Sequence, residues 1–165
     1  MFALIFCLLG DILLIPKGNK WFMYGGISFL LCHLFFVLVY STNIALNNIP
    51  YLFIIPIALI YLIVSLRIIL MLKETTPRFM IVPMYLYLLS NSLMNCFALI
   101  QLINNRNLGS TISYIGALLF FISDCLLFLV RYYKKPEIVY RKHFSVMLTY
   151  LLGTLLITIG TLILH

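Results

Sequence analysis

The sequence predicts an all-α protein, a polytopic membrane helix bundle with about six transmembrane helices. Composition is the first observation behind this fold class: 64% of the 165 residues are hydrophobic and the mean hydropathy is +1.15. Only 9% of the residues are charged, whereas about a quarter are charged in soluble domains. The second observation is that the apolar residues form long runs with short polar breaks. We expect one integral membrane domain over residues 1–165.

A membrane-spanning helix needs about 20 mostly apolar residues. Six stretches approach or reach this length, at residues 1–15, 21–41, 49–72, 79–103, 109–131 and 143–164. The first stretch is short for a span. The breaks between the first five stretches are rich in proline, asparagine, glycine and threonine and lie at residues 16–19, 47–50, 75–77 and 104–109. Asn47 and Asn48 precede Pro50, which suits a first helical turn, and we expect Pro56 to kink the third helix.

The net charge of +7 is not interpreted as nucleic-acid binding, because the basic residues fall in short loops between apolar runs. One side of the predicted membrane receives ten of the eleven basic residues, Lys17, Lys20, Arg67, Lys73, Arg78, Arg131, Lys134, Lys135, Arg141 and Lys142. The other side receives Arg106. The positive-inside rule therefore predicts that the loops after the first, third and fifth helices are cytoplasmic and that both termini face the opposite side.

Two of the four acidic residues lie inside predicted helices. Glu74 and Glu137 fall in loops, whereas Asp11 and Asp124 fall in apolar runs. A charged residue at the bilayer centre costs at least about 2.5–3.5 kcal/mol, so such residues face a bundle interior or a wet cavity and are functional candidates. Either aspartate could instead serve helix packing alone.

Counting residues from the nearest loop places several polar side chains at similar depth. At 1.5 Å per residue, Asp11 lies about 7 Å, Asp124 about 10 Å, Tyr150 about 12 Å and Tyr87 about 13 Å from the cytoplasmic side. We expect these four residues in one slab of the membrane, with His33 below it at about 20 Å.

Helical spacing groups further residues with these. In the fourth helix Tyr87, Asn91 and Asn95 recur at i, i+4 and i+8 and therefore share one face. These three residues could instead serve only to form hydrogen bonds between helices. In the fifth helix Ser123 and Asp124 share a face with Gly116, and in the sixth Gly153 lies beside Tyr150. The glycines on these faces predict close helix contacts. The four cysteines, Cys7, Cys32, Cys96 and Cys125, lie in apolar runs without a C-x-x-C pair, and we interpret them as small buried apolar residues.

Three segments resemble the signatures of the lysoplasmalogenase-like membrane proteins. The first is Leu9-Gly10-Asp11-Ile12-Leu13-Leu14 followed by His33, the second is residues 116–124 (GALLFFISD), and the third is residues 149–151 (TYL). The resemblance covers nearly the whole chain. It implies hydrolysis of the vinyl-ether bond of lysoplasmalogens to a fatty aldehyde and a glycerophospho-alcohol, with a lysophospholipid substrate drawn from membrane lipid.

Two buried carboxyl groups suit this reaction. Hydrolysis of a vinyl ether begins with protonation of an alkene carbon, and two neighbouring carboxyls in an apolar site favour a state in which one holds a proton. We expect Asp11 and Asp124 to be the catalytic acid and base, as in glycoside hydrolysis, with a slight preference for Asp124 as the acid. The supporting or substrate-binding residues that we expect are His33, Tyr87, Asn91, Ser123 and Tyr150. We expect no cofactor and no metal.

Other functions remain open. The family usually has about eight transmembrane helices, with one or two ahead of the Gly10-Asp11 motif, and Phe36 and Thr154 stand where tyrosine and glutamine are expected. An inactive, truncated lipid-binding homologue is therefore one alternative. A small proton-coupled transporter is a second, because Asp11, Asp124 and His33 can form a proton relay. A metal-dependent hydrolase is a third, although no H-E-x-x-H spacing occurs.

Overall fold

The computed structural model describes residues 1–42, 44 and 51–164, and it confirms the all-α fold class. The described residues contain no strand. They form α1 (Phe2–Leu14), α2 (Asn19–Ser41), α3 (Tyr51–Leu72), α4 (Arg78–Asn105), α5 (Leu108–Tyr132), the 3₁₀ turn η2 (Pro136–Ile138) and α6 (His143–Leu164). The breaks expected at Asn47, Asn48 and Pro50 lie outside the described residues.

The helix boundaries agree with the predicted ones to within two residues. Five helices, α2 to α6, are long and apolar enough to cross a membrane. The first helix, α1, has 13 residues, which at 1.5 Å per residue is about 20 Å, less than the hydrocarbon thickness of about 30 Å. Helix α3 continues as an α-helix through Pro56.

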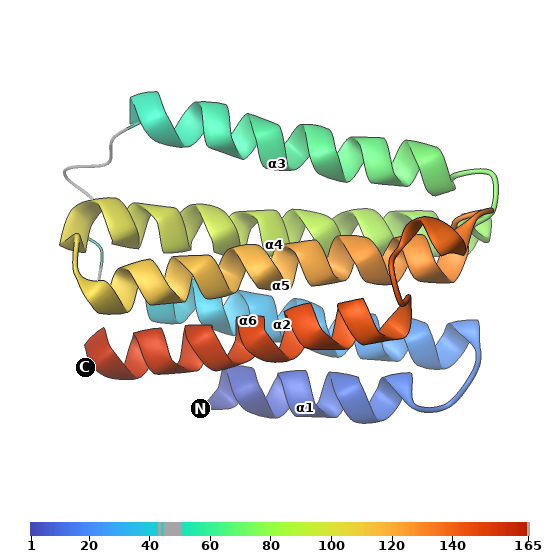
Figure 1. Cartoon of the computed structure of the whole chain (residues 1–165), viewed down its shortest axis with the longest axis horizontal. Helices are drawn as coiled ribbons and strands as arrows, with labels where there is room; N and C mark the ends of the chain where they lie inside the picture. Colours follow the sequence, from blue (N-terminus) through green and yellow to red (C-terminus); the bar gives the residue numbers. More distant parts are fainter. Residues whose placement is uncertain (43, 45–50, 165) are drawn as a thin grey trace.

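The helices run lengthwise beside one another, and the connections after α1, α3 and α5 lie at the same end of the bundle (Figure 1). We call this end the basic end, because these connections and the adjoining helix ends carry ten of the eleven basic residues. Helix α6 ends at the opposite end, whereas the short α1 begins before that end is reached (Figure 1). Lys134 donates to Glu74 across the basic end at 2.7 Å and lowers the pKa of that carboxyl.

A capping box turns the chain between α4 and α5 at the opposite end. Arg106 ends α4 in the left-handed region, with φ 47°. The Asn107 side chain then accepts from the Ser110 amide at 2.8 Å, while the Ser110 hydroxyl accepts from the Asn107 amide at 3.3 Å. Both side chains thereby satisfy backbone donors that would otherwise lack partners at the start of α5.

Helices α5 and α6 form the most extensive helix contact of the bundle. Glycines make the close approach possible: a Cβ at Gly116 would lie 2.7 Å from the Gly153 carbonyl oxygen, and one at Gly160 would lie 2.5 Å from the Ser113 amide nitrogen. The prediction of close contacts at Gly116 and Gly153 is confirmed. Helix α4 lies inside the bundle, where it packs against α2, α3 and α5, whereas the described residues of α1 pack closely only on α2.

The interpretation of all four cysteines as isolated apolar residues is wrong for two of them. Cys7 of α1 and Cys32 of α2 form a disulfide, with 5.6 Å between their Cα atoms. Cys96 and Cys125 are free. Spacing in the sequence does not reveal this pairing, because the two cysteines meet only when α1 and α2 fold against each other.

Candidate active site

Asp11 and Asp124, which are 113 positions apart in the sequence, line the same cavity. We name it the catalytic cavity after the role that we propose for it; it has a volume of about 680 Å³, and its walls come from α1, α2, α5 and α6. Asp124 is 4% exposed, whereas Asp11 is partly exposed. Ser123 and Tyr150 line the same cavity. The structure therefore brings together four of the seven residues that sequence analysis selected.

Tyr150 connects the two sides of the catalytic cavity. Its hydroxyl donates to Asp11 Oδ2 at 2.8 Å, which ties α6 to α1, and its side chain lines the cavity together with Asp124. The Tyr150 ring packs edge-on against Phe29 and Phe120, with centroid distances of 5.7 and 5.3 Å. The hydrogen bond between Tyr150 and Asp11 confirms the common depth predicted for these two residues.

Asn91 contacts Asp124 but does not line the cavity. It is fully buried, and its Nδ2 donates to Asp124 Oδ2 at 2.5 Å. Its Oδ1 in turn accepts from Asn95 Nδ2 at 3.0 Å, and Asn95 Oδ1 accepts from the Tyr61 hydroxyl at 3.3 Å. Asn91 and Asn95, two residues of the polar stripe predicted on the fourth helix, thus belong to a series of hydrogen bonds that ends on Asp124. In each of these bonds the donor is the residue farther from Asp124 along the series.

His33 also faces Asp124 without lining the cavity, and its predicted depth is wrong. Its Nε2 is 3.6 Å from Asp124 Oδ2, so the two residues share one level. The depth count treated Lys20 of α2 and Arg131 of α5 as lying at equal height and ignored helix tilt. The His33 ring is fully buried and packs against Tyr87 and Phe120, with centroid distances of 5.1 and 5.2 Å.

Ser90 determines which ring nitrogen of His33 carries a proton. The Ser90 hydroxyl donates its single proton to the Tyr87 carbonyl oxygen at 2.8 Å. Its oxygen is also 3.2 Å from His33 Nδ1, so Nδ1 must be the donor of that hydrogen bond. In a neutral ring Nε2 is then a bare acceptor that faces Asp124. Sequence analysis missed Ser90, whose only signal is its place beside Asn91.

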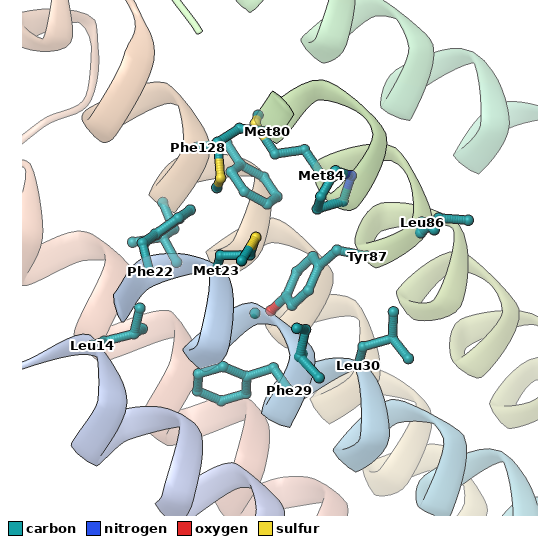
Figure 2. Close-up of a pocket in the computed structure, with 14 residues that line it drawn as sticks. Leu14, Phe22, Met23, Phe29, Leu30, Met80, Met84, Leu86, Tyr87 and Phe128 are labelled. Atoms are coloured by element: carbon teal, nitrogen blue, oxygen red, sulfur yellow. The ribbon is translucent and has the colours of Figure 1, made fainter. Parts of the chain in front are cut away.

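Tyr87 joins the catalytic cavity to a second one. Its phenol interacts with the Asp124 carboxyl, yet its side chain lines a separate apolar cavity between α2, α4 and α5. Figure 2 shows the ring reaching into the middle of that cavity. The ring packs edge-on against Phe128 at 5.4 Å. Six of the seven predicted site residues therefore contact Asp124 or line its cavity, and the seventh, Tyr87, packs against His33, which faces Asp124.

The chain was compared with protein families, curated proteins and solved structures. A sequence model of the YhhN family matches residues 1–161. The chain belongs to the YhhN family. This is the lysoplasmalogenase family, so the resemblance noted in the sequence is confirmed. No curated protein and no solved structure matches the chain.

In this YhhN-family chain the catalytic cavity extends to the basic end, where sequence analysis missed two lining residues. Arg131 and His143 both line the cavity. The Arg131 guanidinium donates to the Gly18 carbonyl oxygen at 3.0 Å and lies 4.1 Å from the centroid of the Phe22 ring. Arg131 follows Asp124 by seven residues and His143 precedes Tyr150 by seven, so a two-turn helical spacing was the available signal.

Two further contacts hold the site of this YhhN-family member in place. Ser123 donates to the Val146 carbonyl oxygen at 2.9 Å, which fixes α6 beside Asp124. The Cys7–Cys32 disulfide joins α1 and α2 one helical turn from Asp11 and directly before His33. Within the described residues no group of three or more His, Cys, Asp or Glu side chains is placed to hold a metal ion.

Proposed function

We propose that this protein hydrolyses the vinyl-ether bond of lysoplasmalogens, with Asp11 and Asp124 as the acid and base. The observation that carries the proposal is that the only two aspartates of the chain, from α1 and α5, line one cavity. Membership of the lysoplasmalogenase family supports the reaction class. A phosphate-bearing lipid suits the cavity, because Arg131 and His143 lie at its basic end.

The surroundings of Asp124 favour it as the acid. His33 Nε2 and Asp124 Oδ2 face each other at 3.6 Å, and Ser90 holds the ring proton on Nδ1. A proton held between Nε2 and Oδ2 makes the two groups attract each other, either as imidazolium and carboxylate or as imidazole and carboxylic acid. We therefore assign His33 the role of keeping a proton available to Asp124.

The reaction then proceeds in balanced steps. Asp124 donates its proton to the alkene carbon remote from the ether oxygen, which leaves an oxocarbenium ion beside the new carboxylate. Asp11 takes a proton from water as the water oxygen bonds to the cationic carbon. The resulting hemiacetal returns its hydroxyl proton to Asp124 while Asp11 protonates the departing glycerol oxygen. The products are a fatty aldehyde and a glycerophospho-alcohol, and one water is consumed.

Tyr150 is the positioning residue for Asp11. Its hydroxyl donates to one carboxylate oxygen at 2.8 Å, which leaves the other oxygen available to accept a proton from water. Asn91 plays the matching part for Asp124 through its hydrogen bond of 2.5 Å. We also propose that the basic end faces the cytoplasm, since ten of the eleven basic residues adjoin it.

The test is to incubate the purified protein in detergent with a lysoplasmalogen and to measure free aldehyde. We expect aldehyde from the parent protein and a loss of at least about 10³-fold in Asp11→Asn and Asp124→Asn, since each removes an acid or base. Glu137→Gln is the matched control, because it makes the same chemical change at an exposed carboxylate. A folded parent protein that binds the lipid and releases no aldehyde contradicts the proposal and favours a lipid-binding role.

A further inference from the structure

A second cavity, of about 190 Å³, lies between α2, α4 and α5 and takes no part in the chemistry described above. We call it the apolar cavity, because Tyr87 has the only polar side chain among the fourteen residues that line it. Figure 2 shows its walls, with Met80, Met84 and Phe128 on one side and Phe29 and Leu30 on the other. An apolar cavity next to a polar one suits a molecule with an apolar tail and a polar head.

The two cavities share a wall of side chains. Leu14, Phe22, Phe29 and Leu127 line both. In the described part of the chain α2 and α5 are not closely packed against each other, so side chains rather than backbone fill the space between them. Side-chain rotation can therefore connect the cavities. Tyr87 lies at this junction, because it lines the apolar cavity and interacts with Asp124.

We propose that the apolar cavity binds the hydrocarbon chain of a single-chain lipid and that Gly26 keeps the cavity open for it. The proposal rests on the proposed function, which supplies the substrate class. With the phosphate near Arg131 and the vinyl ether at Asp124, the chain must leave the catalytic cavity on an apolar side. Methionines, including Met23 and Met84, line the cavity, and their unbranched side chains adapt to a flexible ligand.

Gly26 differs from its neighbour Gly25 in what a side chain would meet. A Cβ at Gly25 would lie 3.0 Å from Leu14 and 3.3 Å from the Gly10 carbonyl oxygen, so that glycine serves the packing of α1 on α2. A Cβ at Gly26 would meet only Tyr87, at 4.0 Å. Gly26 lines the apolar cavity. Its missing side chain therefore leaves room for a ligand rather than for another helix.

One competing path for the chain exists on the same molecule. The catalytic cavity is also lined by Leu8 and Ile12 of α1 and by Met147 and Leu151 of α6, and these four side chains are exposed. A chain lying there would rest between α1 and α6. The apolar cavity is favoured because Met80, Met84 and Phe128, which line it and not the catalytic cavity, are buried, whereas the four side chains on the competing path are exposed.

The first experiment distinguishes these paths by photo-cross-linking. The probe is a lysophospholipid with a saturated ether chain and a diazirine near the chain end, which has no alkene to protonate. We expect cross-links within residues 23–30 of α2 and 80–87 of α4, identified by mass spectrometry. Cross-links confined to α1 and α6, or no cross-link, overturn the proposal. Because the probe is not hydrolysed, this outcome is independent of whether the parent protein releases aldehyde from a true vinyl ether.

The second experiment fills the cavity. Gly26→Leu places about four carbon atoms where the chain would lie, and each excluded methylene costs about fourfold in binding. We expect the affinity ratio for long-chain over short-chain saturated ether probes to fall at least about tenfold. Gly26→Ala should change this ratio little, and Leu38→Phe, which adds bulk on the lipid-exposed side of α2, should leave it unchanged. An equal loss for all chain lengths in Gly26→Leu, or no loss, overturns the proposal.

Discussion

Replacing Asn91 by alanine should slow hydrolysis without changing the fold. The fully buried amide donates to Asp124 Oδ2 at 2.5 Å. The amide donates through Nδ2, because its Oδ1 accepts from Asn95 Nδ2. Asn95 loses one acceptor in this variant but keeps a second, the carbonyl oxygen of residue 91, at 3.1 Å. The principal loss therefore falls on the carboxylate that forms after Asp124 has given up its proton.

The size of the effect follows from the kind of hydrogen bond removed. Hydrogen bonds to charged groups contribute about 1.5–3 kcal/mol. If that contribution is present only once the carboxylate has formed, kcat/KM falls by about 10- to 150-fold. A bond that was equally strong in the resting enzyme would cancel from the barrier. The magnitude thus reports how far Asp124 has released its proton in the transition state.

The assay compares aldehyde release with thermal unfolding for two neighbouring variants. Ser92→Ala is the control, since Ser92 is buried on the same helix but its hydroxyl bonds to the Leu88 carbonyl oxygen and lies near Ser65 of α3. We expect Ser92→Ala to keep parental activity. An Asn91→Ala protein that unfolds at the parental temperature and retains activity within about twofold would refute the role given to Asn91.

Three further outcomes are expected. Ser90→Ala removes the acceptor of the His33 Nδ1 proton and should lower kcat/KM about five- to tenfold, whereas Ser90→Thr, which keeps a hydroxyl, should retain most of the activity; equal losses in both would argue against this role. Gly160→Leu forces a side chain into the backbone of α5 and should destabilise the protein by about 3 kcal/mol or more, so an unchanged melting temperature would contradict the close helix contact. Cys7→Ser or Cys32→Ser removes a disulfide between positions 25 residues apart and should lower the free energy of unfolding by up to about 3–4 kcal/mol. A reductant should destabilise the parent protein by a similar amount and should have no effect on the stability of either variant.

Much of the helix arrangement could be predicted from the sequence. Long apolar runs set the spans, and the breaks at residues 16–19, 75–77 and 104–109 set the helix ends. Asp11 and Asp124 could be chosen because a carboxyl group inside an apolar run has few structural uses. Tyr150 could be placed at the depth of Asp11 because counting residues from the loops gave similar depths on the first and sixth helices.

The rest depended on how the helices pack. The level of His33 was misjudged because residue counting contains no information about tilt. The Cys7–Cys32 bond and the role of Ser90 arise where α1 meets α2 and α2 meets α4, and no pattern within one helix encodes such a meeting. Arg131 was interpreted only as a topology signal, because a basic residue at a helix end satisfies that role without any reference to a cavity.

The hydrogen bonds that end on Asp124 make a lipid-facing helix part of the electrostatics of the site. Tyr61 belongs to α3, which lies at the edge of the bundle in Figure 1, and its hydroxyl donates to Asn95 in the series of hydrogen bonds that continues through Asn91 to Asp124. Each bond polarises the next in an apolar medium. A change at the contact of α3 with α4 would therefore alter the electric field at the Asp124 carboxyl group without reaching either cavity, so the outer surface of the bundle is coupled to its interior.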